Sequence, residues 1–470
     1  MRTLLAWTAD GINSWLEPGE TISAAADNAR RRSSLARIPV GVRLVYQLPL
    51  YAFRSKRTRP RETERPLQVR IPMTSPSTRP QHRALLRLVA LSSALVLLAA
   101  CSSGAGNASD GHGPSGNSSA VQDAQALVKA AESGVVSAPS AQVPLQPISK
   151  FPVALARTPS PSSPKLRGVS GCEDPCGYVA QIVGSIAGQT DGASFVGKVS
   201  TDPQADQQLM SDAVNAKPAA IVVPGISDAS LLQGTASSRA AHVKTVGIAV
   251  EQSVPSGQGY DAYVSVRQDI GYPMMLTTAL ADSGGNAHVA VFTASDLATV
   301  TGYVDNAKRQ FLKQCSRCSV VIKAVDVAAL LDPTQLDQLV TSVLNADPSI
   351  NYLAFGDDYY QFAVVQQAVA RLNRKVTLIS QDGSSAGLQA VKAGLLKYDV
   401  GVPLEWIAYA AYDQIRRVLA GQAPLPPNGW GGGLHLWTSA NLPSEVNDET
   451  GATKIWRTLV PYQAAYKAAW

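Results

Sequence analysis

Several side chains in this sequence are of types that do chemistry, and their spacing suggests which chemistry to test. Residues 383–387 read GSSAG, which fits the G-x-S-x-G pattern that places a nucleophilic serine on a sharp turn. A hydrolase of that type also needs an acid and then a histidine later in the chain. Asp399 or Asp413, followed by His435, would meet this order. The pattern therefore raises the hypothesis of a serine hydrolase with Ser385 as nucleophile.

Metal chemistry has weaker support in the sequence. The five histidines lie far apart and lack cysteines at ligand spacing. The glycines of residues 429–433 follow prolines and not a strand, which disfavours a phosphate-binding loop. We therefore predict no metal site and no cofactor.

The segment that ends at Cys101 has the layout of an export signal. Basic residues at positions 79–87 precede an apolar run over 88–98, which is too short to span about 30 Å of hydrocarbon as a helix. Residues 98–101 read LAAC and resemble the lipobox of bacterial lipoproteins, in which the cysteine is acylated and becomes the new N-terminus. We expect a signal peptide over 73–101, lipidation of Cys101, and an extracytoplasmic protein anchored by lipid to the cell membrane.

The charge distribution separates this leader from the rest of the chain. The net charge is +6, but the excess of Lys and Arg falls within residues 1–100, and the remainder is mildly acidic. A nucleic-acid-binding protein would carry its basic residues on the folded part. We therefore expect no nucleic-acid partner. Residues 1–72 precede Met73, the expected start, and are predicted to be a disordered extension that is not native.

The four remaining cysteines form two close pairs. Cys315 and Cys318 have redox-motif spacing, but they follow a helical pattern and precede a strand, the reverse of a thioredoxin-type motif. Close pairs in an exported protein favour short-loop disulfides. We expect Cys172 to pair with Cys176, which would stiffen its loop, and Cys315 to pair with Cys318.

The pattern after the leader predicts an α/β protein. Residues 102–164 are rich in Gly, Ser, Asn and Pro, with a short helical pattern at 120–133, which is typical of a flexible tether. From Lys165 onward, ten runs of strand length, among them 165–170, 319–325 and 352–355, alternate with amphipathic helical segments. Such alternation predicts doubly wound parallel sheets, and its length suits two lobes. Ligands of these sheets bind at the carboxyl ends of the strands.

At this point the chain resembles the ribose-type, or type I, periplasmic sugar-binding proteins, the lipoprotein substrate-binding components of ABC importers. The resemblance rests on three stretches: AAIVVPGISDASLL from Ala219, ADPSINYLAFGDDYYQFAVVQQAV from Ala346, and the long segment that begins LISQDGSSAGLQAVKAGLL at Leu378. It implies two lobes joined by a three-stranded hinge near Arg267, Gly401 and Leu436. The N-terminal lobe would hold residues 165–266 and 402–436, the C-terminal lobe 267–401, and residues 437–470 would pack on the lobes as a tail.

The resemblance also implies a set of ligand-binding positions. Asp382 matches the family's carboxylate that accepts hydrogen bonds from ligand hydroxyls, and Asp357 matches its usual asparagine. Ser170 and Asp174 match polar positions of the first loop. Either Gln268 or Asp269 falls where the family places another asparagine.

Other family positions have lost their polar or aromatic residues. The usual Asp-Arg pair falls on Ala249 and Val250, the arginine of the second lobe falls near Val304, and the first-loop aromatics fall on Cys176 and Gly177. A replacement ring could come from Trp406 or from one of four tyrosines, because sugar faces are apolar enough to stack on aromatics. Those tyrosines are Tyr178, Tyr303, Tyr359 and Tyr360.

The retained side chains predict an acidic site that disfavours anions. Asp174, Asp269, Asp357, Asp358 and Asp382 are carboxylates, which accept hydrogen bonds from hydroxyls or pair with cations. The expected ligand is thus a sugar, a polyol or a small amine. We expect a monomeric binding protein, not an enzyme, that delivers this ligand to an ABC transporter permease. A solute sensor that presents its closed form to a membrane receptor is the alternative.

Overall fold

The computed structural model describes residues 115–200, 202–295, 298–446 and 449–470. The predicted upstream extension, the signal peptide and the lipidation site at Cys101 lie outside the described residues. Within the described ranges, no helix combines the length and the apolar character needed to cross a membrane.

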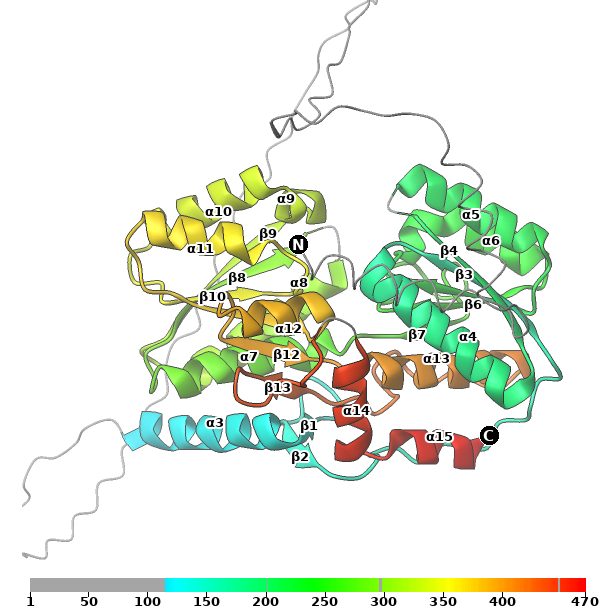
Figure 1. Ribbon diagram of the computed structural model, residues 1–470, viewed down its shortest axis with the longest axis horizontal. Helices are drawn as coiled ribbons and strands as arrows, with labels where there is room; N and C mark the ends of the chain where they lie inside the picture. The colour runs from blue at the N-terminus through cyan, green and yellow to red at the C-terminus, as the bar shows by residue number, and fades with distance from the viewer. Residues whose placement is uncertain (1–114, 201, 296–297, 447–448) are drawn as a thin grey trace, which may run out of the picture. The chain divides into compact units, whose positions relative to one another are not determined.

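The N-terminal lobe is a five-stranded parallel sheet in the order β4-β3-β5-β6-β7 (Figure 1). Apolar side chains of α4 and α13 pack on one face of this sheet and those of α5 on the other. Short helical turns lie at Glu173–Gly177 and Asp228–Leu231. The main elements are β3 (Lys165–Ser170), α4 (Tyr178–Asp191), β4 (Ser194–Val199), α5 (Pro203–Asn215), β5 (Ala220–Pro224), α6 (Leu232–Ala240), β6 (Lys244–Ile248), β7 (Ala262–Val264) and α13 (Leu404–Leu419).

The C-terminal lobe is a six-stranded sheet in the order β13-β12-β11-β10-β8-β9. All its neighbouring strands are parallel except β12 and β13. Helices α7 and α8 pack on one face, and α9, α10 and α11 on the other. The elements are α7 (Gln268–Asp282), β8 (His288–Ala294), α8 (Ala298–Gln314), β9 (Ser319–Val325), α9 (Val327–Leu331), α10 (Pro333–Ala346), β10 (Tyr352–Phe355), α11 (Phe362–Arg371), β11 (Thr377–Asp382), α12 (Ser385–Lys392), β12 (Tyr398–Gly401) and β13 (His435–Trp437).

The chain crosses between the lobes at the three places where the hinge was expected. It passes from β7 to α7 through Arg267, from β12 to α13 just after Gly401, and from α13 back to β13. Because β13 pairs with β12, residues 435–437 belong to the second sheet, whereas the sequence assigned residues up to 436 to the N-terminal lobe. Strand β13 has only three residues between glycines and a turn, which is too short for a strand pattern to be recognised in the sequence.

Residues 115–164 are more ordered than their composition suggests. Helix α3 (Ser115–Ser133) packs on α7, and β1 (Val135–Ser137) pairs antiparallel with β2 (Gln146–Ile148) (Figure 1). Val136 also bridges Leu434 in the third crossing, and both side chains are fully buried. This segment was expected to be a flexible tether, but it packs along the hinge because its few apolar residues find partners there.

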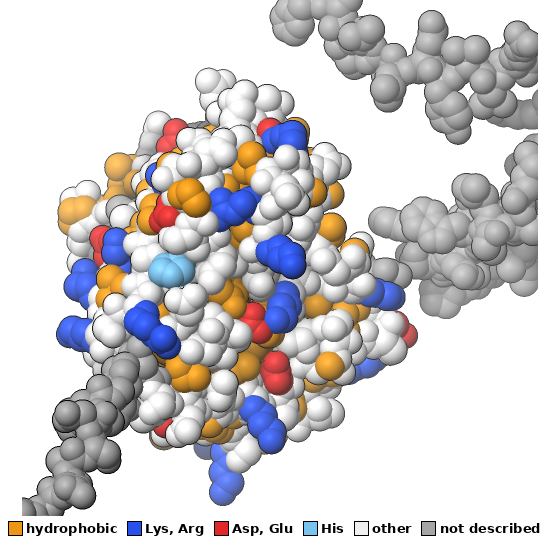
Figure 2. All heavy atoms as spheres, turned by 90° about the vertical axis from the view of Figure 1, so that its left-hand side faces the viewer, with side chains coloured by type: hydrophobic (Ala, Val, Ile, Leu, Met, Phe, Trp, Pro, Cys, Tyr) orange, Lys and Arg blue, Asp and Glu red, His pale blue; other side chains and the backbone are white. Residues whose placement is uncertain are grey.

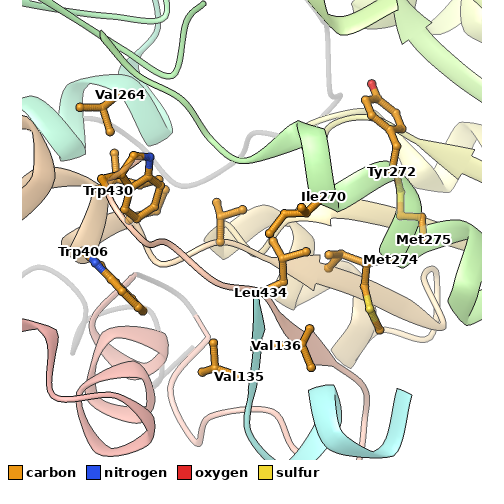
Figure 3. Packing of buried hydrophobic residues seen from close by; sticks show 14 of the residues in the cluster. Val135, Val136, Val264, Ile270, Tyr272, Met274, Met275, Trp406, Trp430 and Leu434 are labelled. Atoms are coloured by element: carbon orange, nitrogen blue, oxygen red, sulfur yellow. The ribbon is translucent and has the colours of Figure 1, made fainter. Parts of the chain in front are cut away.

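One apolar cluster connects the hinge, both sheets and both ends of the described chain. Figure 3 shows Val135, Val136 and Leu434 close together, with Ile270 and Met274 of α7 nearby. Helices α14 (Glu449–Leu459) and α15 (Tyr462–Ala469) complete the cluster by packing against α13. Residues 437–470 were expected to form a tail on the lobes; Trp437 belongs to β13 in the second sheet, and α14 and α15 pack on α13.

Candidate functional site

The carboxyl ends of the two sheets contribute side chains to one shared region. Asp174, in the loop after β3, accepts a hydrogen bond from Ser385 Oγ at the start of α12, 3.1 Å away. Glu251, after β6, is hydrogen-bonded to Tyr303 of α8. Each pair joins the N-terminal lobe to the C-terminal lobe. These contacts define a candidate site between the lobes, at the edge where ligands of parallel sheets bind.

The first loop of the N-terminal lobe is closed by a disulfide. Cys172 is bonded to Cys176, and Asp174 lies exposed between them. Ser170, which ends β3, is buried, and its hydroxyl has no hydrogen-bond partner among the described protein groups. The structure thus brings Ser170 and Asp174 to the same loop, and only Asp174 reaches the other lobe.

Glu251 is a site residue that sequence reasoning missed. Burial raises its pKa to about 7, although hydrogen bonds from Tyr303 and Ser265 favour its charged form. Asn428 donates a 3.4 Å hydrogen bond to the hydroxyl of Tyr303 and accepts one from Ser265. The family's polar pair fell on Ala249 and Val250. Glu251 lies one residue further on, and this acidic residue could have been recognised as the replacement for the lost pair.

Asp357, Tyr359 and Asp382 gather at the carboxyl edge of the C-terminal lobe. The carboxylates of Asp357 and Asp382 both raise the pKa of Tyr359, after burial as the largest cause. Tyr360 donates a 2.8 Å hydrogen bond to Asp357. Asp382 ends β11 with a φ of 129°, a conformation that favours glycine, and such strain is concentrated at functional sites.

Tyr272 of α7 adds a fully buried hydroxyl to this group. It shares a 2.9 Å hydrogen bond with Thr293 near the end of β8. Burial, followed by the charge of Asp357, raises its pKa far above the ordinary value. Sequence reasoning missed Tyr272 because it lies inside an apolar helical segment, where a tyrosine looks like a core residue.

Asp358 points beneath α12 and pairs with a second buried acid. Its carboxylate accepts 2.6 Å hydrogen bonds from the backbone N–H and the hydroxyl of Ser384. Asp399, also fully buried, lies beside it, and a Cβ on Gly387 would come within 2.4 Å of both carboxyl groups. Burial raises the pKa of both acids. Asp358 thus holds the start of α12 in place and adds no open carboxylate to the site.

Asp269 forms a buried ion pair within the hinge. Arg267 binds it through Nε at 2.9 Å and through Nη2 at 3.3 Å, and both side chains are buried. Arg267 also donates to the carbonyl groups of Ala138 and Gly432 and so joins the N-terminal segment to the third crossing. Gln268, the other alternative at this position, is buried at the start of α7. Neutralisation of Asp269 by Arg267 makes the site less acidic than its sequence suggested.

Trp406 lies in the core and not at the strand ends. Its ring stacks on Tyr462 with centroids 5.0 Å apart and packs against Phe151 and Trp430. Figure 3 shows it beside Trp430, and none of its surface is exposed. The four tyrosine candidates all follow strands at the carboxyl edges, so each of them remains a predicted stacking residue.

The residues of the hydrolase hypothesis take part in separate interactions. Ser385 contacts Asp174, whereas Asp399 lies with Asp358 and accepts a 3.1 Å hydrogen bond from Ser380. Asp413 is ion-paired with Arg417. His435 shares a 2.6 Å hydrogen bond with the carbonyl of Gly134, and burial lowers its pKa to about 4. This geometry gives no support to a Ser-acid-His triad.

The remaining features bear on ligand chemistry. The described residues hold no group of three or more side chains suited to a metal ion. Basic side chains on the face in Figure 2 are spread among polar and hydrophobic ones. A cavity of about 440 Å³, lined by Gln252, Tyr260, Tyr263 and Pro424 among others, borders the loop of Glu251 but contains none of the predicted ligand residues.

Comparison with known proteins identifies the family. A model described as a periplasmic binding protein domain matches residues 185–423, about half of the chain. The chain belongs to this family. Periplasmic binding proteins of the type I fold have two parallel-sheet α/β lobes, so the predicted resemblance and fold class are both confirmed. Membership in the family implies an extracytoplasmic location.

Solved structures of sugar-binding proteins share the fold. An ABC transporter solute-binding protein from Agrobacterium vitis, bound to α-D-tagatopyranose, is 13% identical, with a TM-score of 0.51 over 60% of this chain and 96% of its own. The arabinose-binding protein AraP from Geobacillus stearothermophilus is 18% identical, with a TM-score of 0.50 over 60% and 98%. No curated protein matches the sequence. At these identities the likeness establishes the fold.

Proposed function

We propose that this periplasmic binding protein is a lipid-anchored solute-binding protein that captures a sugar or polyol between its lobes and delivers it to an ABC transporter permease. The observation that carries the proposal is the pair of cross-lobe contacts, Asp174 with Ser385 and Glu251 with Tyr303. A ligand that touches both lobes selects the arrangement in which they are close. Hydroxyl groups suit this site because its polar groups are carboxylates, hydroxyls and amides.

The charge of the site supports a neutral ligand. Asp269 is paired with Arg267, and Asp358 is buried with Asp399, so a ligand would meet the carboxylates at the strand ends, those of Asp174, Glu251, Asp357 and Asp382. Arg267 is occupied by Asp269, so it offers no free positive charge to an anion. The related proteins that bind tagatose and arabinose agree with a sugar.

A thermal-shift screen tests the ligand class. Tagatose, arabinose, glucose, galactose and myo-inositol are added to the folded domain, with citrate as an anionic control. A sugar or polyol at 100 times its Kd stabilises the protein by about 2.7 kcal/mol, which gives a clear rise in Tm. A shift with citrate and with none of the neutral compounds would contradict the proposed ligand.

The anchor and the delivery step need separate tests. Cys101→Ser should release the protein from the membrane fraction, since the acylated cysteine is the predicted attachment point. Retention of this variant in the membrane would remove the anchor from the proposal. Transport of the screened sugar into cells that lack the protein should fall to background, and normal uptake together with loss of a sugar response would favour the sensor alternative.

A further inference from the structure

The disulfide ring of residues 172–176 is built into the wall of the N-terminal lobe. Inside the ring, the N–H of Cys176 donates to Cys172 Sγ at 3.2 Å, and the N–H of Gly177 donates to the carbonyl of Cys172 at 3.0 Å. The ring packs against Gly225, just after β5, where a Cβ would lie 2.4 Å from Cys176 Sγ. A side chain at position 225 would displace the sulfur, so the ring is in close contact with the carboxyl end of the sheet.

The ring carries one side chain to the opposite lobe. Asp174 is exposed, whereas Cys176 is buried, and Asp174 Oδ2 accepts the hydrogen bond from Ser385. Ser385 is held equally firmly, because the preceding residue, Ser384, is bound to buried Asp358 through two hydrogen bonds. The contact therefore joins two rigid supports, one covalent and one buried.

We propose that Cys172 and Cys176 are positioning residues, which hold Asp174 against Ser385 and thereby raise the affinity of the interlobe site. The inference rests on the proposed function, because its effect is read as ligand affinity. An exposed carboxylate on a free loop would have to be ordered each time the lobes close. The disulfide ring keeps the loop ordered before the lobes close, so the entropy cost of ordering Asp174 is not incurred on binding, which is the general advantage of preorganisation. A hydrogen bond of this kind is worth about two- to tenfold in affinity.

The second disulfide supplies a matched control. Cys315 and Cys318 close a ring that is one residue shorter, and both sulfur-bearing side chains are buried. This ring lies between α8 and β9, where Cys315 Sγ contacts the carbonyl of Gly285. It therefore sits at the amino end of β9, away from the carboxyl edge that holds the site. Opening either ring removes one disulfide, but only the opening of the Cys172–Cys176 ring should weaken ligand binding.

The experiment compares four variants by calorimetry with the neutral compound that gives the largest thermal shift. Cys172→Ser/Cys176→Ser and Asp174→Ala should each weaken binding about two- to tenfold, because each abolishes the same positioned contact. The triple variant should be no weaker than Asp174→Ala alone. Cys315→Ser/Cys318→Ser should bind like the wild type. Multiplicative losses in the triple variant, or an equal loss in the control, would overturn the inference.

A second readout keeps this test separate from the proposed function. Without any ligand, the amides of Gly387 and Leu388 at the start of α12 should exchange hydrogen faster when the Cys172–Cys176 ring is opened, and not when the Cys315–Cys318 ring is opened. If no sugar or polyol binds, the proposed function fails, while this comparison still decides whether the Cys172–Cys176 ring positions Asp174 against Ser385. Unchanged exchange in both variants would overturn the positioning role.

Discussion

The two lobes hold their ligand-facing edges by different means. In the N-terminal lobe a five-residue disulfide ring presents Asp174. Glu251 accepts a hydrogen bond from Ser265, in the segment between β7 and α7. In the C-terminal lobe the start of α12 is held from below by the buried Asp358 and Asp399. One edge depends on a covalent bond and the other on a buried proton, because two adjacent carboxyl groups cannot both ionise in a dry interior. The lobes should therefore respond differently to substitution and to pH.

The largest effect is expected for Gly387→Ala in the C-terminal lobe. The new Cβ would lie 2.2 Å from Asp358 Oδ2 and 2.4 Å from Asp399 Oδ2, so the buried pair or the helix must move. We expect a loss of about 3 kcal/mol in the free energy of unfolding, measured by urea titration. Gly302→Ala in α8 is the control, because its Cβ meets open space and should gain up to about 1 kcal/mol. Equal effects of the two changes would refute the role of the acid pair.

The next effect is a pH dependence that belongs to the same pair. Burial, and then the charge of Asp358, raise the pKa of Asp399 in the folded state above its unfolded value. The protonated carboxyl group of Asp399 therefore contributes its full stabilisation of the fold below the pKa of the unfolded chain. This contribution is lost as pH rises above about 4. The wild type should lose about 1–3 kcal/mol between pH 5 and pH 8. Asp399→Asn should reduce this loss and leave the part that comes from Glu251, whereas Asp337→Asn on α10, in the half-exposed ion pair with Arg371, should not reduce it; parallel slopes for all three proteins would contradict the shared proton.

A smaller effect is expected at the cross-lobe contact of Glu251. Its pKa is raised to about 7, so Glu251 is neutral at pH 5 and mostly charged at pH 8 in the folded protein. Glu251→Gln should add about 1–2 kcal/mol of stability at pH 8 and little at pH 5, because it removes a partly buried charge. A double-mutant cycle with Tyr303→Phe should give a coupling energy of about 0.5–1.5 kcal/mol. Additive changes would show that the two side chains do not interact.

The sequence predicted the sheets well because strands such as β5, β8 and β10 are mainly apolar runs of strand length. The bounds of β3, β9 and β10 agree with the residues assigned from the pattern. The failures lie where order depends on distant partners. Val136 pairs with Leu434 almost three hundred residues away, and local composition could not show this.

The site was predicted less completely, for reasons that differ by residue. Asp174, Asp357 and Asp382 reach the strand ends because parallel strands bring their carboxyl edges together. Asp269 is neutralised by Arg267, and this pairing could have been suspected from their adjacency. Asp358 is buried by Asp399, a neighbour that only the sheet register brings close. Counting acidic residues therefore overstated the charge of the site.

The substitution Asp382→Gly tests the central claim most directly. Glycine suits the φ of 129° at this position, so the change should leave the Tm unchanged or higher while it removes the carboxylate from the site. Calorimetry with the sugar or polyol found in the screen should show at least about a tenfold loss of affinity, since a ligand hydroxyl loses a charged hydrogen-bond partner. Affinity within about twofold of the wild type, in a variant of unchanged stability, would contradict an interlobe site built on Asp382.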